Sequence, residues 1–160
     1  MALTIENGTV VSGANSYVTV AEYNTWADAR FTTRSTPSEA VSESYILRAT
    51  DYFERQVLRG DKANEAQPMQ FPRVSLVIDG YAVDSDEIPA EVKTAIYELA
   101  YAEETSNGEL NAVERKTSRE AIAGAVDVTY ADNSASRTML PGTSSALRKL
   151  IASPTVVARV

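Results

Sequence analysis

Residues 89–105, with the sequence PAEVKTAIYELAYAEET, decide the fold. Their apolar positions recur three and four residues apart, which is the period of one helix face. Pro89 suits a first helical position because no amide donor is needed there, and Asp86 and Glu87 just before it suit the positive end of a helix dipole. We therefore predict a helix from 89 to about 105 with an inward face of Val92, Ala95, Ile96, Leu99 and Ala102.

Two helices are expected before this segment. Thr19-Val20-Ala21-Glu22 has the spacing of a capping box and predicts a short helix over about 20–31, with Tyr23, Trp26 and Ala27 on one apolar face. Thr36-Pro37-Ser38-Glu39 repeats this spacing and predicts the longest helix, ending near 59 with Gly60 as its C-cap. Its predicted apolar stripe is Val41, Tyr45, Ala49, Tyr52, Phe53 and Val57, and a charge ladder on another face is Arg48, Asp51 and Arg55.

The remaining chain lacks a sustained helical period. Residues 61–88 contain Pro68, Pro72 and Gly80 and are expected to form a long structured loop with a short strand near 74–78. Apolar and polar residues alternate over 126–130, which predicts a β-hairpin with a polar partner near 113–122, a mobile loop being the alternative. A short helix over about 144–152 carries Leu147, Leu150 and Ile151.

These elements predict a mainly α fold, a small bundle of three to four helices with a long structured loop, a β-hairpin and extended terminal arms. The expected organisation is an extended N-terminal arm over 1–18, a helical core with loop and hairpin over 19–132, and a C-terminal docking helix and tail over 133–160. At 160 residues, the chain has an ordinary single-domain length.

The composition argues against common enzyme mechanisms. The chain contains neither histidine nor cysteine, which removes the usual proton-transfer side chain, the soft metal ligands and the strongest common nucleophile. Asp84, Asp86 and Glu87 could begin a calcium loop, but such a loop needs glycine at its sixth position and glutamate at its twelfth, where this chain has Pro89 and Ala95. We therefore expect a protein that is not an enzyme and has no catalytic residues, metal site or cofactor.

Charge is segregated along the chain, whose formal net charge is -7. Residues 79–109 contain nine acids and Lys93 as their one basic residue, whereas residues 133–160 contain four basic residues and no acid. Because a nucleic-acid-binding protein normally presents a basic surface to phosphates, the net charge disfavours tight general DNA binding.

One cluster nevertheless suits a single strand of nucleic acid. Arginines and lysine that could hold phosphates are interleaved with aromatic residues that could stack on bases. The alternative is structural, since the aromatic residues share the core stripe of the second helix and nearby acids dilute the charge. The cluster comprises Arg48, Arg55, Arg59, Lys62, Arg73, Tyr52, Phe53 and Phe71.

Several motifs occur in an order that resembles one protein family. They are NSYVTVAE at 15–22, ILRATDY at 46–52 leading to Arg59-Gly60, QPMQFPR at 67–73, IPAEVK at 88–93 and ELA at 98–100. Their order and spacing resemble the head-tail connector, or adaptor, proteins of tailed bacteriophages, including members labelled as DnaT-like single-stranded-DNA-binding proteins. The polar stretch 109–120 and the tail after Pro154 depart from that pattern.

The resemblance implies a structural virion protein that is made in the host cytoplasm. It implies a ring, commonly of twelve copies, at the neck between the portal protein and a stopper or tail-completion protein, with double-stranded DNA passing through and no membrane partner. The alternative is a phage accessory protein that binds single-stranded DNA. The expected channel-facing acids are Glu98, Glu103, Glu104 and Glu109, and the expected interface residues are Arg137, Leu147, Arg148, Lys149, Leu150, Ile151, Val156, Val157 and Arg159.

Overall fold

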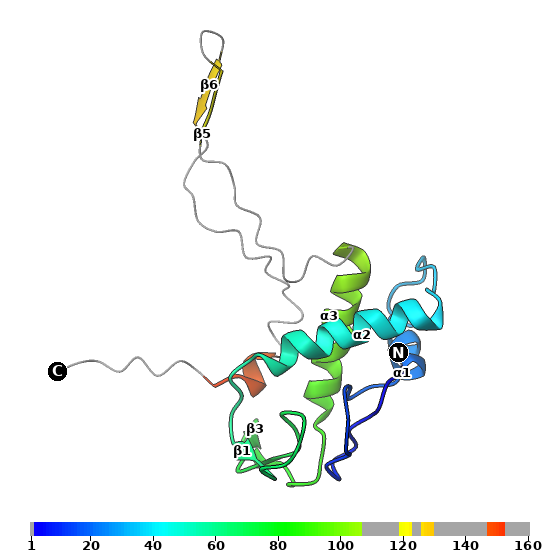
Figure 1. Cartoon of the computed structure of the whole chain (residues 1–160), viewed down its shortest axis with the longest axis vertical. Coiled ribbons are helices and arrows are strands. Elements are labelled where there is room, and N and C mark those ends of the chain that lie inside the picture. The colour runs from blue at the N-terminus through cyan, green and yellow to red at the C-terminus, as the bar shows by residue number, and fades with distance from the viewer. Residues whose placement is uncertain (1, 107–118, 123–125, 130–146, 153–160) are drawn as a thin grey trace, which may run out of the picture.

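Three helices and a C-terminal helical turn organise the computed structural model, which describes residues 2–106, 119–122, 126–129 and 147–152 (Figure 1). The helices are α1 (Val20–Asp28), α2 (Glu39–Glu54) and α3 (Ala90–Ser106), and residues 147–150 form the turn. The predicted fold class, a mainly helical bundle with a β-hairpin, is confirmed. In the described part of the chain, no helix is long and apolar enough to cross a membrane.

The core lies where α2 crosses α3, and α1 packs against both helices (Figure 1). The predicted inward face of α3 is confirmed, since its five apolar residues are all buried. The predicted stripe of α2 is partly wrong, because Val41 is 40% exposed and Val57, which lies beyond the helix, is 73% exposed. The buried residues of α2 are Ser42, Ile46, Ala49, Thr50 and Phe53.

The two predicted helix starts have different outcomes. At α1 the capping box is present, with the Thr19 hydroxyl accepting from the Glu22 amide and the Glu22 carboxylate accepting from the Thr19 amide. At α2 the predicted box is wrong, because the helix begins at Glu39, two positions later than predicted. Ser38 is the N-cap and makes no side-chain capping bond, and the Thr36 hydroxyl bonds to Asp28 instead.

Residues 2–18 double back on themselves, which differs from the predicted extended arm. Ile5 and Ser16 form a bridge, and the buried Glu6 carboxylate accepts hydrogen bonds from three loop amides at 2.8–3.0 Å. Tyr17 and Val18 are fully buried in the core. The segment folds inward because Glu6 satisfies the loop amides and its two apolar end residues join the core.

The predicted structured loop contains two small antiparallel pairs. In the first, β1 (Asp61–Lys62) pairs with β2 (Arg73–Val74), and in the second, β3 (Val77–Ile78) pairs with β4 (Tyr81–Ala82). The predicted hairpin further along the chain is also present, with β5 (Arg119–Ile122) antiparallel to β6 (Val126–Thr129). The turn of that hairpin, at 123–125, lies outside the described residues.

Candidate nucleic-acid interface

Arg73, predicted to contact phosphate, is a buried clamp on the chain after α2. Its guanidinium donates to the carbonyl oxygens of Arg59 at 2.7 Å, Leu58 at 3.3 Å and Gly60. It also donates to the carbonyl and the side-chain oxygen of Gln70, at 3.1 and 2.8 Å. Because these bonds use all three guanidinium nitrogens, Arg73 fixes the backbone, as the structural alternative for the cluster has it, and is not available to bind phosphate.

Two of the three aromatic residues in the predicted cluster are also buried. Phe53 and Phe71 are at most 1% exposed and meet the edge of Tyr17 at ring-centroid distances of 5.8 and 6.1 Å. The Tyr17 hydroxyl donates to Glu54 and accepts from the Phe71 amide, and burial beside that carboxylate raises the Tyr17 pKa. Phe53 and Phe71 therefore belong to the core, which agrees with the structural alternative of the sequence analysis, and they are not available to stack on bases. Tyr52 is half-buried.

One exposed cation of the cluster, Arg59, contacts the C-terminal turn. Leu58 pairs with Ile151, and the Arg59 amide donates to the Leu150 carbonyl at 2.9 Å. The Arg59 Nε also donates to the Ile151 carbonyl at 3.1 Å. This pairing joins exposed basic residues from two distant parts of the sequence, here called the basic corner: Arg55, Arg59, Lys62, Arg148 and Lys149.

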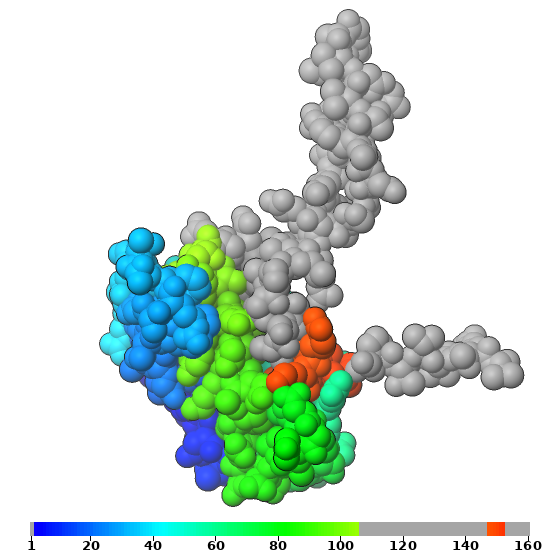
Figure 2. Space-filling model, turned by 180° about the vertical axis from the view of Figure 1, so that it is seen from behind, coloured from blue at the N-terminus to red at the C-terminus, as the bar shows by residue number. Residues whose placement is uncertain are grey.

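The basic corner keeps several cations available for a ligand. Lys149 contacts Asp79 at 2.5 Å and lies 4.0 Å from Glu91, and the hydrogen bond to Asp79 raises the Lys149 pKa. Within the described residues, Arg55, Lys62 and Arg148 form no ion pair. Figure 2 shows residues 147–152, in orange, against the green part of the chain and beside the teal segment that follows α2.

The predicted interface residues divide by burial. Leu147 and Leu150 are 7% and 0% exposed and complete the core of their own chain, with Ile151 half-buried beside them. Arg148 and Lys149 are exposed. In the sequence analysis these apolar residues are assigned to an interface because an apolar helix face does not by itself show whether it covers its own core or a neighbouring subunit. Four members of the set lie outside the described residues: Arg137, Val156, Val157 and Arg159.

Two of the predicted channel-facing acids form internal contacts. The Glu103 carboxylate is fully buried and lies 3.5 Å from the Arg48 guanidinium. Glu104 accepts from the Tyr23 hydroxyl at 2.7 Å and from Arg34 at 2.7 and 2.8 Å. These contacts tie α3 to α1, to α2 and to the loop between those two helices.

The other two acids are placed differently. Glu98 is half-buried, and its buried Oε2 has no hydrogen-bond partner among the described residues. Burial raises the Glu98 pKa, although Arg30 opposes the shift. Glu109 lies outside the described residues. Whether any of the four acids faces a channel stays a prediction.

A strip of aromatic residues that the sequence analysis did not single out lies between α1, the loop that follows it and α3. Phe31 and Tyr101 stack with centroids 3.8 Å apart, Trp26 stacks on Tyr97 at 5.5 Å, and Arg30 lies 4.6 Å over the Trp26 ring. Tyr97 and Tyr101 are four residues apart on the predicted third helix, so their shared face was readable from the sequence.

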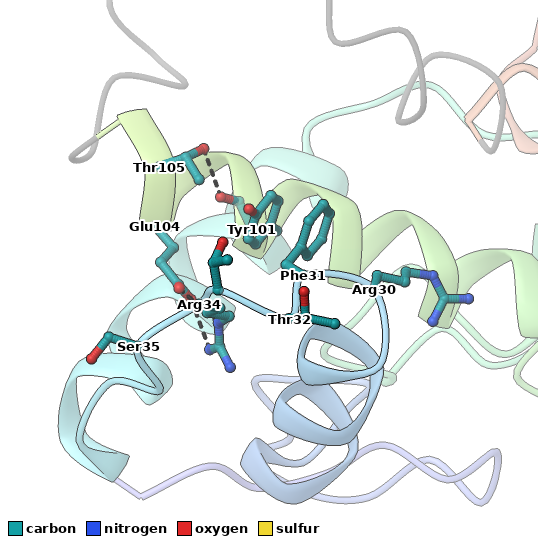
Figure 3. A pocket seen from close by; sticks show the side chains of 9 residues that line it. Arg30, Phe31, Thr32, Arg34, Ser35, Tyr101, Glu104 and Thr105 are labelled. Atoms are coloured by element: carbon teal, nitrogen blue, oxygen red, sulfur yellow. Dashed lines mark hydrogen bonds and ion pairs between the residues drawn. The ribbon is translucent and has the colours of Figure 1, made fainter.

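A shallow pocket of about 450 Å³ adjoins this strip (Figure 3). Phe31 and Tyr101 line it together with Arg34 and Glu104. The Arg34 guanidinium is fully engaged by Glu104, Asn24 and Asp28. Because Arg34 is already neutralised, Arg30 is the one cation of the pocket lining without an ion pair to a described residue, and the pocket is less suited to phosphate than the basic corner.

The carboxylates are not gathered for metal binding. Among the described residues, no group of three or more histidine, cysteine, aspartate or glutamate side chains is placed to hold a metal ion. Asp84, Asp86 and Glu87 are all exposed before α3.

A protein-family model matches residues 1–160, the whole chain, and its description is "Putative DnaT-like ssDNA binding protein". A search of curated proteins and a search of solved structures each found no match.

Proposed function

The chain belongs to this DnaT-like family, and we propose from that membership that it is a phage accessory protein that binds single-stranded DNA through the basic corner. The observation that carries the proposal is the backbone pairing of Leu58 with Ile151, which brings the segment that carries Arg59 against the turn that carries Arg148 and Lys149. Neither sequence segment alone supplies a basic surface of this size.

The chemistry of the corner suits phosphate rather than base edges. Exposed guanidinium and ammonium groups displace the counterions that surround a nucleic-acid backbone, and this contribution does not depend on sequence. The remainder of the chain is acidic, since the whole chain with the basic corner included has a net charge of -7, and this acidity opposes binding elsewhere. Binding is therefore local, independent of sequence and strongly weakened by salt.

Fluorescence anisotropy with a labelled oligo-dT tests the proposal. With three to five phosphate contacts, the logarithm of the binding constant should fall against the logarithm of salt concentration with a slope of about -2 to -3.5. An oligo-dT that does not bind at low salt would refute the proposal.

A second candidate is the head-tail adaptor subunit, which the segregated charge favours. Residues 79–109 carry nine acids, and Asp84, Asp86 and Glu87 are exposed. An acidic lining repels phosphates and so lets double-stranded DNA slide through a ring without sticking. We propose for this candidate a ring of about twelve copies, by resemblance alone, that joins a portal protein to a stopper or tail-completion protein.

The location of the protein separates the two candidates. An adaptor is a stoichiometric part of the virion neck, whereas a DNA-binding accessory protein stays in the infected cell. Quantitative mass spectrometry of purified particles, followed by electron microscopy of the neck, should detect an adaptor. Its absence from the particle would exclude that role.

A further inference from the structure

Tyr81 is an aromatic residue whose side chain is exposed to solvent. It is 80% exposed, whereas its partner across the hairpin, Ile78, is 7% exposed. Between them, Asp79 and Gly80 have φ values of 52° and 90°, as in the tight two-residue turns that fix hairpin register. The buried Ile78 anchors the hairpin, so the exposed ring of Tyr81 is presented on a defined backbone.

Two contacts place this hairpin beside the basic corner. Asp79, in the turn, forms the ion pair with Lys149. Gly60 packs tightly on the strand that leads into the hairpin, since a Cβ atom there would lie 2.5 Å from the Val74 carbonyl oxygen and 3.3 Å from the Leu76 nitrogen. Tyr81 is thus connected to both segments that supply the cations.

We propose that Tyr81 stacks on a nucleobase of the single strand whose phosphates the basic corner holds. The inference rests on the proposed function and adds a residue that favours single-stranded DNA over a duplex. A duplex hides its base faces in the stack, whereas a single strand offers them to an aromatic ring. Since every base has such a face, the contact is tolerant of sequence.

The test compares Tyr81→Ala and Tyr81→Phe on two labelled oligonucleotides, oligo-dT and an abasic strand of the same length and charge. On oligo-dT, Tyr81→Ala should raise the dissociation constant by about 5- to 150-fold, while Tyr81→Phe keeps wild-type affinity because the ring remains. On the abasic strand all three proteins should bind equally. Val77→Ala, which trims another exposed side chain of the hairpin, is the matched control and should change neither affinity.

The outcomes separate the two proposals. If wild-type protein binds both strands with a steep salt dependence and Tyr81→Ala binds oligo-dT equally well, the stacking contact is refuted and the proposed function stands. The same holds if Tyr81→Ala weakens binding to both strands by the same factor. If wild-type protein binds neither strand, the proposed function fails and the stacking contact fails with it.

Discussion

Arg73→Lys tests the clamp on which the basic corner depends. The guanidinium donates to five oxygens, four of them backbone carbonyls, whereas a lysine ammonium has three donors on a single atom. At least two oxygens therefore lose their donor. Each buried polar group left unsatisfied costs about 1–3 kcal/mol, and partial solvent access favours the lower half of that range. The expected loss in free energy of unfolding is about 2–4 kcal/mol.

Urea denaturation followed by circular dichroism measures this loss. For a chain of this length, it corresponds to a fall in Tm of roughly 4–16 °C. Arg55→Lys makes the same change at an exposed site and should stay within about 0.5 kcal/mol of wild type. If Arg73→Lys is as stable as Arg55→Lys, the clamp does not hold the backbone as inferred.

Three further predictions concern stability. Gly60→Ala should destabilise by about 1–3 kcal/mol more than Gly80→Ala, because both sites have positive φ but a Cβ meets close backbone atoms only at Gly60, and equal losses in a urea melt would contradict this. Glu6→Ala should cost about 2–4 kcal/mol, since three loop amides lose their acceptor, and unchanged thermal stability would contradict that contact. Burial raises the Glu98 pKa, so the folded state keeps a proton over a pH window in which the unfolded chain releases it, and wild-type stability falls as pH rises through that window. The free energy of unfolding of Glu98→Gln should therefore exceed that of the wild-type protein by about 1 kcal/mol or less above this window, and the two should be equal below it. A difference that stays constant across pH would show that burial does not raise the Glu98 pKa.

Local signals predicted part of the fold. The helical period of 89–105 gave the buried face of α3, the Thr19–Glu22 spacing gave the start of α1, and alternation over 126–130 gave one strand of a hairpin. Each of these patterns is complete within a few residues, so no distant contact could override it.

Tertiary packing decided the remainder. Arg73 reads as a surface cation until its carbonyl acceptors are known, and Leu150 reads as an interface residue until its own core is seen to need it. The Asp79-Gly80 pair between apolar residues was a readable hairpin signal that would have located Tyr81. The basic corner itself joins residues about ninety positions apart, which no local pattern contains.

The most direct test of the account is the salt dependence of oligo-dT binding in the triple variant Arg55→Ala/Lys62→Ala/Arg148→Ala. These exposed cations form no ion pair within the described residues, so their removal should leave the fold intact. We predict a log-log slope shallower than that of wild type by about 2, with unchanged thermal stability, whereas Arg30→Ala, in the loop after α1, keeps the wild-type slope. A triple variant that keeps both the affinity and the slope of the wild-type protein would contradict the assignment of the basic corner as the DNA-binding surface.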